Sequence, residues 1–380
     1  MKKVCVVVGT RPEAIKMAPV VLALQERSDL FGVTVCSTGQ HTTMLEGAMA
    51  AFGIKPDKEL SVMQSGQSLA QLTSRLLLAL DEYFEVIGPD LVLVHGDTAS
   101  AMAGALAAFY RQIDVGHIEA GLRTRNLSSP FPEEYNRRSV AIATRYHFAP
   151  TQAARLNLES EGISPKQIIV TGNTVIDALQ YTIRSLEVNI GEIAGLRSQL
   201  ILELGFDPTQ KTFVLITAHR RENFGVGLKK IYFSIRELAK ANPDLFFVYP
   251  VHLNPKVKNA VDTELGGVSN VALIPPQDYR TFAWLLHKCL LVLTDSGGIQ
   301  EEATALGKPV LVMRDTSERP EAIHAGIAKL VTTSTQVIIR EVQNLISNGV
   351  EYERMAQSIN LFGDGQAAKK IVEHLSFDVR

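Results

Sequence analysis

The sequence has few cysteines, a single tryptophan and no long uncharged apolar segment. Its three cysteines lie far apart, each in or beside a strand-like apolar run: Cys5, Cys36 and Cys289. This placement favours buried free thiols over a disulfide or metal framework. The longest uncharged helical candidate, residues 98–110, is well below the ~20 residues that span a bilayer. The apolar stretch 4–8 is also too short for a signal-peptide core. We therefore expect a cytoplasmic protein without a membrane partner.

Neither sign of charge prevails. Lys and Arg total 38 against 40 for Asp and Glu, giving a net charge of −2, so the overall charge does not favour a nucleic-acid partner. Any anionic ligand must be held by local groups. With 46% hydrophobic residues the chain can bury a substantial core. Its 380 residues exceed what one core usually supports and predict about two domains.

Short apolar runs alternate with helical patterns, which is typical of βαβ units and parallel sheets. Strands are expected near 4–8, 33–37, 91–95, 115–118, 146–149 and 168–171, and again near 213–217, 245–251, 271–274, 290–294, 309–312 and 329–331. The predicted fold class is α/β, with two Rossmann-like, doubly wound parallel-sheet domains. Residues 173–206 are helical in pattern without a strand, so the domains are expected at 1–172 and 173–363.

Polar residues follow many of the predicted strands. They occupy 9–11, 39–41, 95–97 and 117–119 in the first half, and 217–220 and 294–298 in the second. Ligands bind beyond the carboxyl ends of open parallel sheets, because helix N-termini and loop amides converge there. If the two carboxyl edges face each other, both domains line one cleft.

The segment 295–302 is the strongest candidate for anion binding. Ser296, Gly297 and Gly298 follow a predicted strand and open a helix whose free amides can hold a pyrophosphate. The alternative is an N-cap and tight turn that serve packing alone. Arg319 lies one βα unit further on and can add positive charge, although a single arginine is more often a surface residue.

The first loop, residues 9–19, has neither the spaced glycines of a dinucleotide site nor the Gly-Lys-Ser/Thr of a phosphate loop. Nicotinamide chemistry and ATP hydrolysis therefore lose support, and no cofactor is predicted. Arg11 and Lys16 can instead present two cations at a helix N-terminus. The alternative is a capped helix with Lys16 in solvent.

Three acids stand where a general base or a charge stabiliser is needed: Asp97, Glu119 and Glu133. A carboxylate in a dry cleft can act as a general base, a role worth about 10²- to 10⁴-fold in rate. Alternatively, Asp97 caps the helix that begins near Thr98, and Glu133 with Glu134 are first-turn acids favoured by the helix dipole.

His219 is the best partner for phosphates or a sugar hydroxyl in the second half, since it ends a predicted strand and heads a glycine-containing loop. A lone histidine is more often structural. His95 and His117 lie on separate predicted strands and no paired cysteines accompany them, so no metal site is predicted.

Taken together, these motifs resemble the series found in the non-hydrolysing UDP-N-acetylglucosamine 2-epimerases, in order and spacing along nearly the whole chain. They are 9–16, 95–98, 117–123, 132–134 and 296–298. The resemblance implies a glycosyltransferase-B architecture in which a C-terminal helix, here 364–380, returns to the first domain. It also implies a homodimer, a UDP-sugar substrate and a role in bacterial surface polysaccharide synthesis.

The resemblance further implies reversible conversion of UDP-N-acetylglucosamine to UDP-N-acetylmannosamine, by elimination of UDP to 2-acetamidoglucal and re-addition with inversion at C2. The family's active-site positions correspond to Arg11, Lys16, Asp97, Glu119, Glu133 and His219. Its uridine, ribose and pyrophosphate positions correspond to Gln277, Phe282, Ser296, Gly297, Gly298, Glu302 and Arg319. The alternatives are a hydrolysing epimerase, an epimerase for a diacetamido-sugar nucleotide, a glycosyltransferase and a non-catalytic UDP-sugar sensor.

One departure concerns a regulatory site. Many bacterial relatives have an arginine after a Gln-His pair that contributes to a second UDP-sugar site. Here Gln40-His41 is followed by Thr42-Thr43-Met44. The resemblance therefore leaves the second site open.

Overall fold

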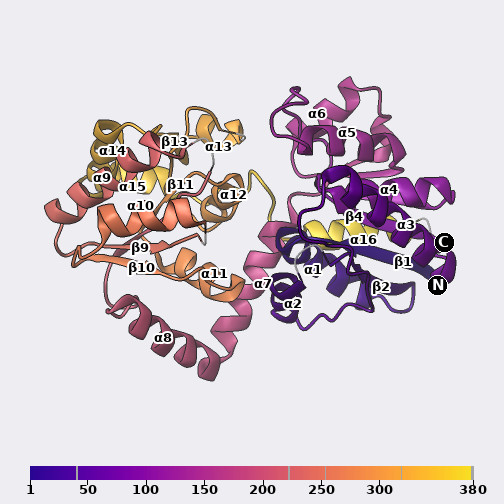
Figure 1. Cartoon of the computed structure of the whole chain (residues 1–380), viewed down its shortest axis with the longest axis horizontal. Helices are drawn as coiled ribbons and strands as arrows, with labels where there is room; N and C mark the ends of the chain where they lie inside the picture. The colour runs from indigo at the N-terminus through magenta and orange to yellow at the C-terminus, as the bar shows by residue number, and fades with distance from the viewer. Residues whose placement is uncertain (40–41, 221–222, 253, 318, 378–380) are drawn as a thin grey trace. The chain divides into compact units, whose positions relative to one another are not determined.

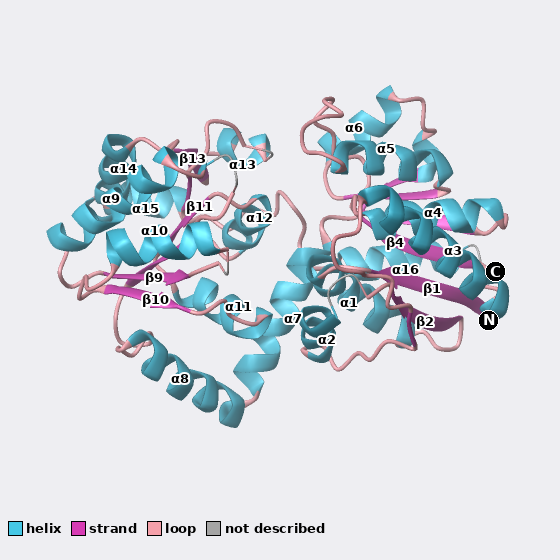
Figure 2. Ribbon diagram, viewed as in Figure 1, coloured by secondary structure: helices cyan, strands magenta, loops and turns pink. Residues whose placement is uncertain are grey.

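The computed structural model describes residues 1–39, 42–220, 223–252, 254–317 and 319–377 (Figure 1). The chain divides into two compact units. Unit 1 consists of Met1–Tyr181 and Phe362–Arg380, and unit 2 of Thr182–Leu361. Each unit is a parallel sheet with helices (Figure 2), which confirms the predicted α/β class.

Unit 1 contains a seven-stranded parallel sheet in the order β3-β2-β1-β4-β5-β6-β7. Its strands are β1 Lys2–Val8, β2 Phe31–Ser37, β3 Lys58–Glu59, β4 Leu91–His95, β5 Asp114–Ile118, β6 Tyr146–Ala149 and β7 Ile168–Val170. Val92 and Leu93 point to opposite faces of the sheet, yet both are fully buried, because helices cover both faces. The sequence did not indicate β3, which consists of two exposed residues and has no apolar run.

The helices of unit 1 alternate with these strands and include an alanine-rich helix that lies close to the sheet. Gly104 on this helix, α4, allows the close approach, since a Cβ there would lie 3.2 Å from Val94 Cγ1. The packed helix expected at 98–110 is thus confirmed. The helices are α1 Arg11–Gln25, α2 Thr42–Ala50, α3 Leu69–Ile87, α4 Ala99–Tyr110, α5 Glu133–Ala143, α6 Gln152–Ser160, the 3₁₀ turn η1 Pro165–Gln167 and α16 Ala367–Phe377.

Unit 2 repeats the architecture with a six-stranded parallel sheet in the order β10-β9-β8-β11-β12-β13. Its strands are β8 Phe213–Thr217, β9 Phe246–Pro250, β10 Val271–Ile274, β11 Leu291–Thr294, β12 Val310–Val312 and β13 Ala328–Leu330. Its helices are α8 Ile190–Leu204, α9 Val226–Ala241, α10 Pro255–Leu265, α11 Tyr279–Lys288, α12 Gly297–Ala305, α13 Pro320–His324, α14 Thr335–Ser347 and α15 Gly349–Met355. All twelve predicted strands are therefore present in the two sheets.

The chain leaves unit 1 through the helix α7, Thr174–Val188. The division falls inside this helix, after Tyr181, because its first turns pack on unit 1. The ring of Tyr181 lies 5.4 Å from that of Phe52, and Asp177 Oδ1 accepts a 2.8 Å hydrogen bond from the amide of Ala368 in α16. The last helix begins at Ala367 because Asp364 Oδ1 accepts the Gln366 amide and forms a turn before it.

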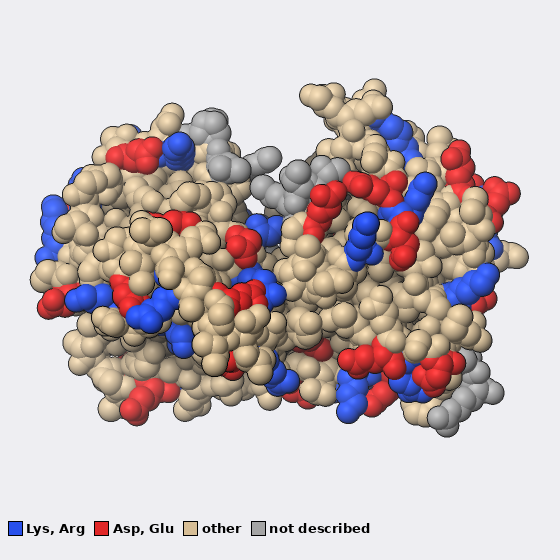
Figure 3. Space-filling view, turned by 90° about the horizontal axis from the view of Figure 1, so that it is seen from below, with Lys and Arg blue, Asp and Glu red and all other residues tan. Residues whose placement is uncertain are grey.

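All three cysteines are buried, as predicted. Within the described ranges, none of the helices combines the length and apolar composition that crossing a bilayer requires. On the face shown in Figure 3, acidic and basic side chains are interspersed, which agrees with the nearly balanced composition.

Candidate active site

The turn between β1 and α1 is fixed by a buried carboxylate, Glu13. Thr10 caps α1 and forms a reciprocal capping box with Glu13. Glu13 also accepts hydrogen bonds from the Gly9 amide at 3.1 Å and from Thr98 Oγ1 at 2.6 Å. Burial raises the pKa of the Glu13 carboxyl, and the hydrogen bonds from Thr98 and Thr10 oppose that shift. Glu13 thus ties the loop after β1 to the loop after β4.

The two cations predicted at this turn lie on α1. Arg11 is the first residue of the helix and is half-buried. Lys16 lies further along, and its Nζ forms an ion pair with Glu119 Oε2. The alternative of a solvent-facing Lys16 is therefore wrong, because its charge is directed to the carboxyl edge of the sheet.

Glu119 follows β5 and is the most constrained of the three predicted acids. Its carboxylate has Lys16 as an ion-pair partner, accepts a 2.7 Å hydrogen bond from Asn173 Nδ2 and lies 3.6 Å from His95 Nε2. Its side chain is 9% exposed, and its φ of 64° lies in the left-handed region. A non-glycine residue in that region costs about 1 kcal/mol or more, and such strain is typical of functional sites.

Asp97 follows β4 and does not cap the next helix. That role belongs to Thr98, whose side chain accepts the Ala101 amide at 3.0 Å. The Asp97 carboxylate instead forms an ion pair with Arg137 of α5, and its backbone carbonyl accepts from Asn136 Nδ2 at 2.9 Å. The capping alternative is wrong, and Asp97 joins the β4 loop to α5.

The neighbouring acids Glu133 and Glu134 both lie in the first turn of α5. Glu134 is fully buried and accepts the amides of Thr124 and Arg125 at 2.9 and 3.0 Å. Its role is therefore to hold the preceding loop. Glu133 Oε2 is also buried, but has no hydrogen-bond partner among the described residues. A buried carboxylate oxygen without a partner calls for an explanation, and a catalytic role is one.

The predicted residues of unit 1 thus gather at the carboxyl ends of β1, β4 and β5 and at the first turn of α5. Two hydrogen bonds join the β4 and β5 ends: the Gly96 amide donates to Ile118 O at 2.9 Å, and His117 Nε2 lies 2.7 Å from Gly96 O. A Cβ on Gly96 would lie 3.8 Å from Glu119 Oε1. The loop that carries Asp97 therefore lies next to Glu119.

In unit 2, a buried aspartate organises the loop that carries His219. Asp295, which is 0% exposed, accepts through Oδ2 the amides of His219 and Arg220 at 2.9 and 2.8 Å and Asn223 Nδ2 at 3.1 Å. The His219 ring stacks on that of His252, with centroids 5.3 Å apart. Burial lowers the pKa of His219, against the raising effect of Asp295.

The N-terminus of α12 has the features expected of an anion site. Ser296 occupies the N-cap position without a side-chain capping bond, and its amide donates to Thr294 Oγ1 at 2.9 Å. Gly297 and Gly298 form the first turn, where backbone amides lack intrahelical acceptors. A Cβ on Gly298 would meet nothing within 4 Å. The capping alternative therefore lacks the side-chain bond on which it depends.

Arg319 is buried and not a surface residue. Its Nε pairs with Glu301 of α12, and its amide donates to Ser317 Oγ at 2.9 Å. Ser317 Oγ in turn donates to Gln300 Oε1 at 2.6 Å. These contacts place Arg319 beside the helix whose first turn contains the two glycines.

The remaining predicted residues lie on or near α11 and α12. Glu302 accepts a 3.1 Å hydrogen bond from Tyr279 Oη, and Phe282 is half-buried on α11. Gln277 precedes α11, and its Nε2 donates to Glu203 Oε2 at 2.9 Å. Glu302 is thus joined to α11, while Gln277 is joined to α8.

Comparison with known proteins decides the family. The model of a family described as "UDP-N-acetylglucosamine 2-epimerase" matches residues 22–376. The UDP-N-acetylglucosamine 2-epimerase of Escherichia coli K12 is 49% identical over 373 residues, 98% of each chain. The chain belongs to the UDP-N-acetylglucosamine 2-epimerase family. It is therefore an epimerase, which is an isomerase.

Solved structures agree with this assignment. The crystal structure of the epimerase from Neisseria meningitidis bound to UDP-GlcNAc has a TM-score of 0.91 at 50% identity, covering 98% of this chain and 99% of that one. The enzyme from Methanocaldococcus jannaschii in complex with UDP-GlcNAc and UDP has a TM-score of 0.82 at 30% identity, covering 99% of each chain. The glycosyltransferase-B-like fold class expected from the sequence is thereby confirmed.

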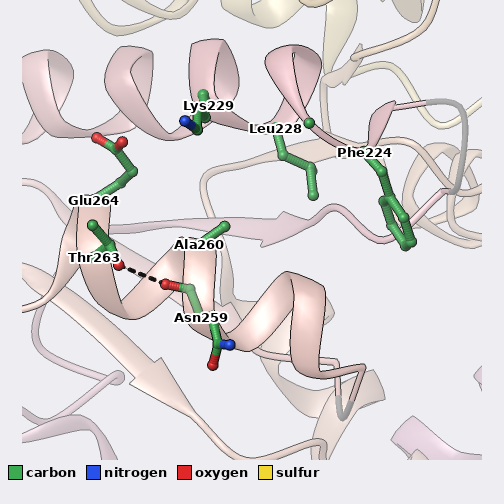
Figure 4. A pocket seen from close by; sticks show the side chains of 8 residues that line it. Phe224, Leu228, Lys229, Asn259, Ala260, Thr263 and Glu264 are labelled. Carbon is green, nitrogen blue, oxygen red and sulfur yellow. Dashed lines mark hydrogen bonds between the residues drawn. The ribbon is translucent and has the colours of Figure 1, made fainter.

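A pocket of about 460 Å³ lies between α9 and α10, and Phe224, Leu228 and Ala260 contribute much of its apolar lining (Figure 4). None of the predicted site residues lines it.

Within the described residues, no group of His, Cys, Asp and Glu side chains is arranged to hold a metal ion. Gln40 and His41, at the possible regulatory site, lie outside the described residues.

Proposed function

We propose that the epimerase interconverts UDP-N-acetylglucosamine and UDP-N-acetylmannosamine without hydrolysis. The family and the UDP-GlcNAc bound to the Neisseria meningitidis relative support the substrate. The observation that carries the proposal is the strained, partly buried Glu119, which pairs with Lys16, accepts a hydrogen bond from Asn173 and lies next to His95. Such a constrained acid next to a cation is suited to a reaction that develops charge on a sugar ring.

The chemistry follows from the weak acidity of the C2 proton. This carbon has no adjacent carbonyl, so a carboxylate cannot remove its proton without help. Departure of UDP from C1 supplies that help, because an oxocarbenium-like C1 makes the C2 proton acidic. Loss of the proton gives 2-acetamidoglucal, and re-addition of UDP at C1 with protonation of the opposite face of C2 gives the epimer. Proton, leaving group and electron pair are all returned, so no cofactor is required.

In this proposal the unit 2 residues hold the nucleotide. The amides of Gly297 and Gly298, with Arg319 and His219, bind the diphosphate and stabilise its charge as it leaves. One such preorganised donor is typically worth about 3 kcal/mol in a transition state. The remaining predicted positions bind uridine and ribose: Gln277, Phe282, Ser296 and Glu302.

The unit 1 residues handle the proton and the cationic ring. We assign Asp97 and Glu133 to the two faces of C2, and Glu119 to stabilising positive charge on the ring. The unpartnered Glu133 Oε2 supports a role in proton transfer. The cations Arg11 and Lys16 offset the charge of the acids and of the departing UDP.

Amide substitution of each acid tests these roles. We expect Asp97→Asn, Glu119→Gln and Glu133→Gln each to slow deuterium incorporation at C2 from heavy water by about 10²-fold or more. Asp114→Asn is the matched control, since Asp114 lies at the opposite end of β5 and pairs with Arg145 near the surface. Wild-type exchange rates in all three acid variants would reject the assignment.

Product analysis separates the proposal from its alternatives. UDP-N-acetylmannosamine as the first product, with no free sugar, supports the non-hydrolysing reaction. Free N-acetylmannosamine and UDP would identify a hydrolysing enzyme. Turnover of a diacetamido-sugar nucleotide, with none of UDP-N-acetylglucosamine, would identify an epimerase for that other substrate. UDP-sugar binding without any turnover would identify a sensor.

The proposal includes a homodimer in the bacterial cytoplasm that supplies UDP-N-acetylmannosamine for surface polysaccharide. Large apolar side chains stand exposed on three helices of unit 1, among them Val86 on α3, Phe109 on α4 and Ile142 on α5. A second copy of the chain that packed against these side chains would remove them from water, as expected of a surface that self-associates. Light scattering that gives the mass of one chain at micromolar concentration would contradict the dimer.

A further inference from the structure

Asn173 stands immediately before α7 and contacts Glu119 from outside every motif that the sequence singled out. It is 1% exposed. Its Nδ2 donates to Glu119 Oε2 at 2.7 Å, and its Oδ1 accepts the Val175 amide at 3.1 Å. Its own amide donates to Phe362 O at 2.6 Å. Both polar atoms of the Asn173 side chain therefore have hydrogen-bond partners, Nδ2 with Glu119 and Oδ1 with the start of α7.

The orientation of the Asn173 amide follows from its neighbours. An ionised carboxylate only accepts hydrogen bonds, so the group that faces Glu119 must be the NH₂. The Val175 amide only donates, so the opposite end must be the carbonyl oxygen. Lys16 gives Glu119 a charge partner on a flexible stem, whereas the planar amide of Asn173 gives it a fixed direction.

The backbone of Asn173 is held where two distant segments meet. The chain passes from unit 1 to unit 2 through α7 and returns at Phe362. Next to Asn173, Gly172 lies so close to Gly363 that a Cβ on it would be 2.8 Å from the Gly363 Cα. Together with the bond to Phe362 O, this contact fixes the point from which the Asn173 side chain reaches Glu119.

We propose that Asn173 is a positioning residue for the epimerisation: its amide holds the Glu119 carboxylate in the orientation that the reaction uses. Glu119 needs such support because its carboxylate stands at the end of a side chain with several rotatable bonds, so its direction is fixed by the groups that contact it. The inference rests on the proposed function, since it assigns Asn173 a role in that reaction.

The variant Asn173→Ser removes the donor and keeps a side-chain oxygen for the start of α7. Serine is too short to reach Glu119. We expect kcat to fall about 10-fold or more, with KM within about 2-fold, because a hydrogen bond to a charged group is lost while nucleotide binding is kept. Asn270→Ser is the matched control. Asn270 is a buried asparagine of unit 2 that donates to three backbone carbonyls, so its loss lowers stability but leaves kcat per folded molecule unchanged.

A double-mutant cycle distinguishes positioning from a general structural role. In a Glu119→Ala background, with residual turnover followed over long incubations, Asn173→Ser should have little further effect on kcat. An equal fold-loss in both backgrounds would overturn the inference, as would a wild-type kcat for Asn173→Ser. If the serine variant does not fold, Asn173→Asp keeps the size and the acceptor, removes the donor and adds a negative charge next to Glu119, so kcat must fall by at least about 10-fold. A wild-type kcat for Asn173→Asp would then overturn the inference. Absence of turnover in the wild type would reject the proposed function instead.

Discussion

Replacing Asp295 with alanine should release the loop that carries His219. The carboxylate is fully buried and accepts three hydrogen bonds, from two loop amides and from Asn223. A buried donor left without its acceptor costs about 1 kcal/mol or more. Three donors therefore give a loss of roughly 3 kcal/mol in the free energy of unfolding. Asp295→Asn keeps one oxygen in place and should lose about 1 kcal/mol.

Urea unfolding followed by circular dichroism measures the stability, and calorimetric titration with UDP measures the binding. We expect Asp295→Ala to lower the stability, the affinity for UDP and kcat, because His219 loses its fixed position. Asp207→Ala is the control: Asp207 accepts the Thr209 amide and pairs with Arg197, yet it precedes β8 and should leave UDP affinity unchanged. An Asp295→Ala variant with wild-type stability and kcat would refute the reasoning.

Three further predictions concern pH and two glycines. Burial lowers the pKa of His117 to about 3 and that of His147 to about 4. As the pH falls below about 6.5, these histidines therefore bind protons in the unfolded chain but not in the folded protein. The free energy of unfolding should fall by about 2 kcal/mol per histidine between pH 7 and pH 5. An unchanged urea midpoint over that interval would contradict this. Gly121→Ala should lower the free energy of unfolding by about 3 kcal/mol, because φ is 92° and the added Cβ would lie 2.3 Å from Ala154 O. A melting temperature within a degree of wild type would contradict this prediction. Gly298→Ala should raise the melting temperature slightly, because alanine favours the helix more than glycine does. It should also weaken UDP binding, since the added methyl group enters the open space at the first turn of α12. An unchanged affinity for UDP would show that Gly298 is not part of the anion site.

The sequence predicts the fold well because several strands, among them β4 and β12, are short apolar runs of Val and Leu. Such runs arise when both faces of a parallel sheet are buried, as at Val92 and Leu93. The carboxyl ends of these strands meet at one edge of each sheet. Asp97 and Glu119, which follow adjacent strands in unit 1, are therefore brought to the same edge by topology alone. The strand β3 has no such run, because it consists of two exposed charged residues, and the sequence therefore does not predict it.

The partners of the site residues could not be predicted from the sequence. Arg137 is 40 residues from Asp97, Asn173 is 54 from Glu119 and Asp295 is 76 from His219, and no local spacing connects them. Glu133 and Glu134 are adjacent residues of the same type. Only burial and hydrogen bonding separate the available carboxylate from the one that holds a loop. Asp295 was visible as a polar residue after a strand, but its role as an acceptor of three bonds was not.

Reversible cleavage of the bond between C1 and the UDP oxygen is the central claim, and an isotope label in that bond tests it most directly. UDP-N-acetylglucosamine with ¹⁸O in the bridge between C1 and the β-phosphorus is incubated with the epimerase, and ³¹P NMR follows the label. We predict that ¹⁸O moves from the bridging position to the non-bridging β-phosphate positions while C2 inverts. Inversion at C2 with the label retained entirely in the bridge would contradict the account.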